Sequence, residues 1–141
     1  MERVIHAKPL VAGTASGEAL ISSEPLSFWG GYDHRDGSII DRRHPLNGKI
    51  AAGKILGIPF TRGSSTTTAV LVESIKVNTA PAAIICNRIE AFLSLAAIVA
   101  DELYGKRVPI IFTEPEEFET LKTGQRIAIR GDGSILIADS Q

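Results

Sequence analysis

Apolar residues along this chain follow different spacings in its N-terminal, central and C-terminal parts. In the N-terminal part, short apolar runs at 4–7 and 19–21 lie on either side of a turn rich in small residues at 13–17. Short apolar runs separated by glycine favour β-strands over helices. The next stretch, 27–37, shows no clear period, and its residues 33–37 predict a turn between short strands.

The central part alternates between continuous apolar runs and helical spacing. Continuous runs at 54–58, 82–86 and 109–112 are typical of parallel strands that are buried on both faces. Between them, the apolar spacing at 65–76 and 91–103 predicts two helices. The order strand, helix, strand, helix, strand indicates parallel strands joined by right-handed crossovers.

The C-terminal part returns to strand spacing. Residues 125–130 alternate between apolar and polar, and a Gly-Asp-Gly turn at 131–133 leads to a second apolar run at 134–138. This pattern predicts a β-hairpin. We therefore expect one α/β domain over residues 1–141, with a central mixed or parallel sheet or barrel-like core, two main helices and flanking antiparallel strands.

Composition and charge exclude several classes of protein. Apolar residues make up 44% of the chain, charged residues 22%, and the net charge is −1, so no surface for nucleic acid or membrane is indicated. No apolar run approaches the ~20 residues of a membrane helix, and the N-terminus lacks the apolar core of a signal peptide. The single cysteine excludes an internal disulfide framework and a metal cluster held by this chain's cysteines alone. We expect a cytoplasmic protein.

A hydroxyl-rich turn, residues 57–68, joins the first central strand to the first helix. Backbone N–H groups at the start of a helix hold negative charge, so we predict half of an active site here. Gly63 permits close approach of the backbone to a ligand, and Arg62 suits a bidentate pair with a carboxylate. The alternative is that Ser64, Ser65 and Thr66 are helix caps, each worth ~1 kcal/mol of stability.

Other polar residues are weaker candidates. Cys86 ends an apolar run, so we expect a buried, unreactive thiol. His44 follows two arginines, and we expect this basic run to form a solvated face or docking surface rather than an anion pocket. Asn87 and Arg88 follow a strand, where open α/β sheets bind ligands, and a pocket role there is the lesser alternative. His34, in a turn, is expected to be exposed.

Five motifs follow one another at characteristic spacings. They are 42–48 (RRHPLNG), 53–56 (GKIL), 62–65 (RGSS), 80–85 (APAAII) and 97–103 (AIVADEL), which leads to Pro109. In their order and spacing these motifs resemble one family, the small subunit or swivel domain of aconitase X enzymes. The resemblance covers about residues 4–138.

The resemblance implies a swivelling β/β/α domain that docks against a larger subunit carrying an iron–sulfur cluster. Such a pair dehydrates a hydroxy acid, and this chain alone would be inactive. The family's motif assigns the role of catalytic base to Ser64, and the amides and hydroxyls of 63–66 would hold the substrate carboxylate. The segment 27–31 is more similar to the cis-3-hydroxy-L-proline dehydratase branch than to the phosphomevalonate dehydratase branch, whereas Thr67 departs from the usual pattern.

Two other functional classes remain open from the residues. Phosphohistidine carrier domains have a similar swivel fold, but their Ser-His pair corresponds here to Ser94 and Leu95. Leucine cannot accept a phosphoryl group, so this class is disfavoured. The third alternative is a stand-alone, non-catalytic binding module that holds a small carboxylate in the hydroxyl-rich turn.

Overall fold

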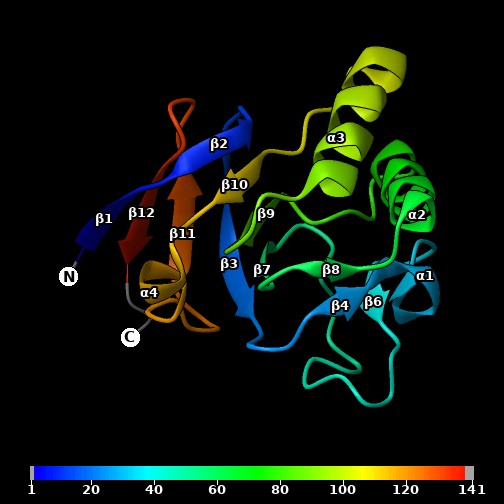
Figure 1. Ribbon diagram of the computed structural model, residues 1–141, viewed down its shortest axis with the longest axis horizontal. Coiled ribbons are helices and arrows are strands. Elements are labelled where there is room, and N and C mark those ends of the chain that lie inside the picture. The colour runs from blue at the N-terminus through cyan, green and yellow to red at the C-terminus, as the bar shows by residue number, and fades with distance from the viewer. Residues whose placement is uncertain (1, 139–141) are drawn as a thin grey trace.

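Eight strands form one mixed sheet that curls into a nearly closed, barrel-like core in the computed structural model (Figure 1). The structure describes residues 2–138. The strand order in this sheet is β1-β12-β11-β3-β7-β9-β10-β2. The bounds of these strands are β1 Glu2–His6, β2 Lys8–Val11, β3 Ala15–Ile21, β7 Ile55–Gly57, β9 Ala83–Cys86, β10 Ile110–Phe112, β11 Arg126–Ile129 and β12 Ser134–Ala138.

Two small sheets and four helices complete the described chain. The first small sheet pairs β4 with β8 in parallel, and the second pairs β5 with β6 antiparallel. Of the helices, α2 and α3 are long and α1 and α4 are single turns. The bounds are β4 Leu26–Ser27, β5 Tyr32–Asp33, β6 Ser38–Ile39, β8 Thr61–Arg62, α1 Phe28–Gly31, α2 Ser65–Lys76, α3 Ala91–Tyr104 and α4 Pro115–Phe118.

The centre of the sheet confirms the predicted parallel arrangement. β9 pairs in parallel with both β7 and β10, as predicted. β3 also pairs in parallel with β7, a pairing that the sequence pattern does not predict. All four residues of β9 are buried, as its continuous apolar run predicts. The predicted C-terminal hairpin is also present, because β11 and β12 pair antiparallel.

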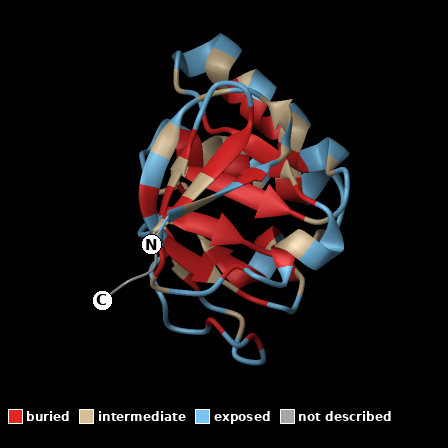
Figure 2. Ribbon diagram, turned by 90° about the vertical axis from the view of Figure 1, so that its left-hand side faces the viewer, coloured by how far each residue is buried: buried red, intermediate tan, exposed pale blue. Residues whose placement is uncertain are grey.

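Successive side chains of the central strands enter two separate apolar clusters, because a strand alternates its side chains between the two faces of a sheet. Ile84 belongs to the cluster beneath α2 and α3, together with Leu71 and Leu93. Ile85 belongs to the cluster inside the barrel, together with Ile127. Figure 2 shows the resulting buried interior, with exposed positions on the outer loops and on the outer side of the long helices.

The N-terminal strands extend further than their apolar runs predict. β3 begins at Ala15 and includes Ser16 and Glu18, which are exposed on the strand. β2 includes Pro9 at a place where its register with β10 shifts. Polar positions on the solvent side of a strand, and a proline at the end strand of a sheet, weaken the local signal without preventing pairing.

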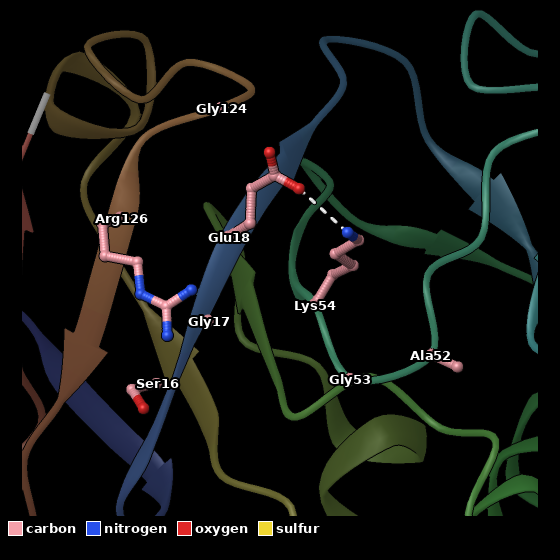
Figure 3. Close-up of a pocket in the computed structure, with 8 residues that line it drawn as sticks. All are labelled: Ser16, Gly17, Glu18, Ala52, Gly53, Lys54, Gly124 and Arg126. Atoms are coloured by element: carbon pink, nitrogen blue, oxygen red, sulfur yellow. Dashed lines mark hydrogen bonds and ion pairs between the residues drawn. The ribbon is translucent and has the colours of Figure 1, made fainter. Parts of the chain in front are cut away.

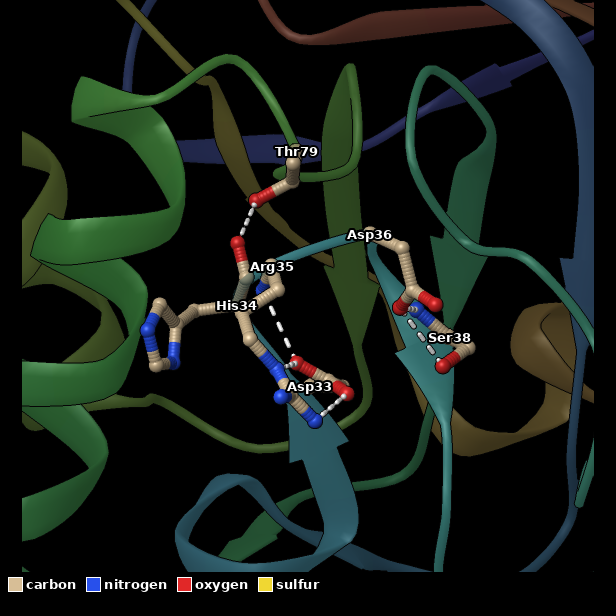
Figure 4. Close-up of polar contacts among 6 residues, drawn as sticks. All are labelled: Asp33, His34, Arg35, Asp36, Ser38 and Thr79. Atoms are coloured by element: carbon tan, nitrogen blue, oxygen red, sulfur yellow. Dashed lines mark hydrogen bonds and ion pairs between the residues drawn. The ribbon is translucent and has the colours of Figure 1, made fainter.

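The predicted turn between short strands is the β5–β6 hairpin, which polar contacts fasten to the loop after α2 (Figure 4). The Arg35 guanidinium donates to both carboxylate oxygens of Asp33 at 2.9–3.0 Å, and the Ser38 backbone and hydroxyl donate to Asp36. Thr79 Oγ1 donates to the carbonyl of His34 at 2.5 Å, and Tyr32 Oη donates to the carbonyl of Thr79 at 2.7 Å. His34 itself is exposed, as expected.

Candidate functional site

The hydroxyl-rich turn lies at the carboxyl edge of the parallel strands. The chain leaves β7, passes through Pro59 and β8, and enters α2, while the neighbouring strand β9 leads into α3. The backbone N–H of Asn87 donates to the carbonyl of Pro59 at 3.0 Å. Glu90, just before α3, accepts hydrogen bonds on Oε1 from both the backbone N–H and the hydroxyl of Thr61. Open α/β sheets bind their ligands at this edge.

Gly63 gives the turn its shape. Its φ of +115° lies in the region that residues with a side chain rarely adopt. A Cβ at this position would lie 3.1 Å from Thr67 Oγ1, which is a tight contact. The positive φ would strain such a residue as well. Glycine at position 63 therefore allows the chain to reverse directly into α2.

Ser64 is the N-cap residue of α2 by position, but its side chain makes no capping hydrogen bond in the described turn. Its backbone carbonyl accepts the N–H of Thr67 at 3.0 Å. The alternative that this serine is a helix cap therefore loses its physical basis, because the capping contribution comes from the side-chain oxygen. The Ser64 hydroxyl remains available to an external group.

The turn is open to its surroundings rather than sealed in the core. Residues 62–66 are all exposed, and the first turn of α2 contains no acidic residue that would offset the helix dipole. The predicted site residues Gly63, Ser64, Ser65 and Thr66 thus lie together at the positive end of a twelve-residue helix. Such a surface attracts a carboxylate or an oxyanion.

The three threonines of the turn have different surroundings. Thr66 is exposed, whereas Thr67 is fully buried and its Oγ1 lies 3.4 Å from the carbonyl of Arg62. Thr68 Oγ1 donates to the carbonyl of Phe92 at 3.2 Å, which joins α2 to the start of α3. Thr67 and Thr68 therefore stabilise the turn through contacts with neighbouring backbone carbonyls. Of the three threonines, only Thr66 is exposed to solvent.

Arg62 lines a neighbouring cleft of about 420 Å³ that residues 63–66 do not line. Besides Arg62, the cleft is lined by Glu24, Pro25, Ser27, Asp41, Arg43, His44 and Pro45.

The expectation that the whole basic run is a solvated or docking face is wrong for His44. Arg42 and Arg43 are exposed, but His44 is only 6% exposed. Its Nδ1 accepts the backbone N–H of Leu46 at 3.1 Å, so Nε2 carries the proton and donates to the carbonyl of Glu24 at 3.2 Å. Sequence spacing contains no signal for this role, because Glu24 is twenty positions away.

Cys86 and Asn87 lie near the turn without joining it. Cys86 is fully buried, as predicted, and burial raises the pKa of its thiol, with the Glu90 carboxylate adding to the rise. Asn87 lines a pocket of about 460 Å³ together with residues of β3 and of the segment around α4. Arg88 stacks on the ring of Phe60 at 3.8 Å from its centroid.

A polar cleft of about 530 Å³ lies elsewhere, along β3, β11 and the loop before β7 (Figure 3). Lys54 Nζ and Glu18 Oε1 form an ion pair at 2.8 Å in this cleft, and Lys54 lowers the pKa of the Glu18 carboxyl. The sequence contains no signal for this cleft, because Glu18 and Lys54 are far apart in the chain. Its charges are already partly paired with each other.

Within residues 2–138, no group of three or more His, Cys, Asp or Glu side chains is arranged to hold a metal ion. The buried Cys86 thiol is likewise unsuited to ligate one. The described residues therefore do not fit the ligand set of an iron–sulfur cluster. None of the described helices is long and apolar enough to cross a membrane.

Comparisons with known proteins agree on one family. The chain is 50% identical over 107 residues to a cis-3-hydroxy-L-proline dehydratase from Pseudomonas aeruginosa, covering 76% of this chain and 18% of that protein. It is 34% identical over 136 residues to the phosphomevalonate dehydratase small subunit of Thermococcus gammatolerans, covering 96% and 98%. The chain spans only about a fifth of the length of the first curated relatives that it matches.

A solved structure and a family model match nearly the whole chain. The crystal structure of Thermococcus kodakaraensis aconitase X in its holo-form superposes with a TM-score of 0.86 at 31% identity, covering 97% of this chain and 99% of that chain. The family model that describes the aconitase X swivel domain matches residues 4–137. The chain therefore belongs to the aconitase X swivel domain family.

Proposed function

We propose that this chain is the small subunit of an aconitase X-type hydro-lyase that dehydrates a hydroxy acid. The observation that carries the proposal is the open turn at the start of α2, where Ser64 presents a hydroxyl that does not cap the helix. The relatives named as dehydratases and dehydratase small subunits support the same class of reaction. The expected compartment is the cytoplasm.

The favoured substrate is cis-3-hydroxy-L-proline, with phosphomevalonate second. The 50% identity to a hydroxyproline dehydratase exceeds the 42% and 34% identities to phosphomevalonate dehydratase small subunits. Both substrates carry a carboxylate and a hydroxyl group, so both require the same kind of anion-binding turn.

Ser64 is the proposed base, which removes the proton next to the substrate carboxylate. A serine hydroxyl is a weak acid, and its alkoxide needs nearby N–H donors and the positive helix end to stabilise it. As the proton moves to Ser64 Oγ, negative charge spreads onto the carboxylate oxygens of the substrate. The amides and hydroxyls of Gly63, Ser65 and Thr66 would hold these oxygens, and Arg62 would be a further anchor if substrate extends into its cleft.

The larger subunit would hold the iron–sulfur cluster, since the described residues of this chain do not fit it. When bound there, the cluster would supply a Lewis acid for the departing hydroxyl group. The active site would then lie between the two subunits, and this chain alone would be inactive.

The test is co-expression with the larger chain, followed by assays on both substrates. We expect the wild-type complex to be active and the Ser64→Ala complex to lose activity by about a hundredfold or more, which is the usual contribution of a positioned base. Ser23→Ala is the matched control, because Ser23 is exposed and lies outside the turn. It should retain wild-type activity.

Two results would contradict the proposal at different points. An assembled Ser64→Ala complex with full activity would remove the proposed base. A well-assembled wild-type complex that dehydrates neither substrate would leave a binding role for the turn and reject these two reactions.

A further inference from the structure

The outward side of α3 is apolar where a surface helix is ordinarily charged. Residues 91–100 contain no charged side chain, and Phe92, Leu95 and Ile98 are 40%, 49% and 50% exposed. Ile89, just before the helix, is 68% exposed. Surface helices usually place charged residues opposite their buried face, so a contiguous apolar outer face indicates a contact with another molecule.

This apolar face adjoins the Ser64 turn. The hydrogen bond from Thr68 Oγ1 to the carbonyl of Phe92 holds the start of α3 against the start of α2. The parallel pairing of Ser27 with Arg62 also brings α1 beside β8, the strand that leads into the turn. Trp29 in α1 is 68% exposed, whereas its neighbour Phe28 is fully buried. Large exposed apolar side chains therefore lie on the two elements next to the turn, α1 beside β8 and α3 beside α2.

We name these five residues the turn-flanking surface: Trp29, Ile89, Phe92, Leu95 and Ile98. The other large apolar side chains that are exposed in the described chain lie on β1, in the loop between β6 and β7, and at the C-terminal ends of α2 and α3. Single exposed apolar residues are ordinary, but a group with aromatic members around a candidate site has the composition of an interface core.

We propose that the turn-flanking surface is where this chain docks against the larger subunit, an inference that rests on the proposed function. In the longer relatives, the matched segment is about a fifth of a single protein, while other relatives of this chain are named as separate small subunits. A domain that occurs both as a segment of a long protein and as a separate subunit needs a face that packs against the rest of the enzyme, which makes up the other four-fifths of the long protein. Apolar docking around the turn would exclude water from the Ser64 hydroxyl and bring the partner's groups to it.

The experiment uses the full chain and the larger chain of the same organism, defined as the protein similar to the unmatched four-fifths of the longer relatives. Binding is measured by titration calorimetry and by size-exclusion chromatography. Leu95→Lys and Phe92→Lys place a charge in the turn-flanking surface and should raise the dissociation constant by about tenfold or more. Val4→Lys is the matched control, since Val4 is 49% exposed like Leu95 but lies on β1, and it should change binding by less than about twofold.

Each outcome is decisive. Circular dichroism of every variant must match the wild type, and Leu95→Lys and Phe92→Lys serve as independent probes of the same surface. Wild-type binding that survives both substitutions overturns the surface but leaves the proposed function intact. Failure of the wild-type chain to bind overturns the proposed function and the surface with it. Self-association of the free chain that both substitutions abolish would assign the surface to a second copy, and would likewise overturn the proposal.

Discussion

At the scale of single residues, different members of the turn set its backbone conformation and present its free hydroxyl group. Gly63 supplies a backbone conformation that other residues rarely adopt, and the buried Thr67 supports it from behind. Ser64 makes no capping bond, so its hydroxyl contributes nothing visible to the start of α2. A residue that does not stabilise the local structure is a candidate for chemistry, which is why we keep the prediction that Ser64 is the base.

Gly63→Ala should destabilise the protein by about 1–3 kcal/mol, the usual cost of a residue held in an unfavourable backbone region. The new Cβ would also press on Thr67 Oγ1. Urea unfolding monitored by circular dichroism measures this change. Gly131→Ala is the control, because a Cβ there meets nothing within 4 Å, and it should alter stability by less than about 0.5 kcal/mol. Equal effects at the two positions would contradict the role given to Gly63.

At the scale of elements, local spacing predicted the helices and central strands well. The helix predicted at 65–76 is α2, and the helix predicted at 91–103 is α3 with one further residue. Helical spacing depends on neighbours three or four residues apart, which the sequence displays directly. The N-terminal strands were predicted too short, since Ser16 and Glu18 belong to β3 through pairing with the distant strand β11.

The β5–β6 hairpin should lose stability in acid. Hydrogen bonds from the Arg35 guanidinium, and then from its backbone, lower the pKa of Asp33 from 3.8 to about 2. A lowered pKa in the folded state means that this contribution is present above about pH 3.8 and disappears as the pH falls towards 2. Thermal unfolding of wild type and Asp33→Asn should therefore differ at pH 6 and converge between these two values. Arg35→Ala should behave similarly, and a difference that stays constant down to pH 2 would contradict this account.

At the scale of the whole molecule, the barrel-like sheet and the two long helices enclose separate apolar clusters on the two faces of β9. The order of strands and helices was enough to predict parallel central strands and an α/β fold, because crossover connections have a strong preferred hand. It did not predict that β1 pairs with β12 or that β2 pairs with β10, since these pairings join the N-terminal strands to residues far along the chain.

Cys86 reports on the integrity of this enclosed core. The thiol is fully buried and burial raises its pKa, so it should be nearly unreactive in the native protein. At pH 8, labelling by a disulfide reagent should be about a thousandfold slower than in urea, where the thiol is exposed, and should accelerate only as the fold opens. Rapid labelling of the native chain would show that the end of β9 opens independently of global unfolding.

The sequence by itself determined the two long helices, the central strands, the C-terminal hairpin and the Gly-Ser-Ser turn before α2, because each depends on residues close together in the chain. The order of these motifs along the chain also determined the family resemblance. Only the tertiary structure decided which of the turn's side chains stay open, that His44 is a buried hydrogen-bonding residue, and that Arg62 lines a cleft together with Glu24 and His44. It also decided that apolar side chains from α1 and α3 flank the turn. These features depend on contacts between residues twenty or more positions apart, such as Thr61 with Glu90, and such contacts form only when the whole chain packs.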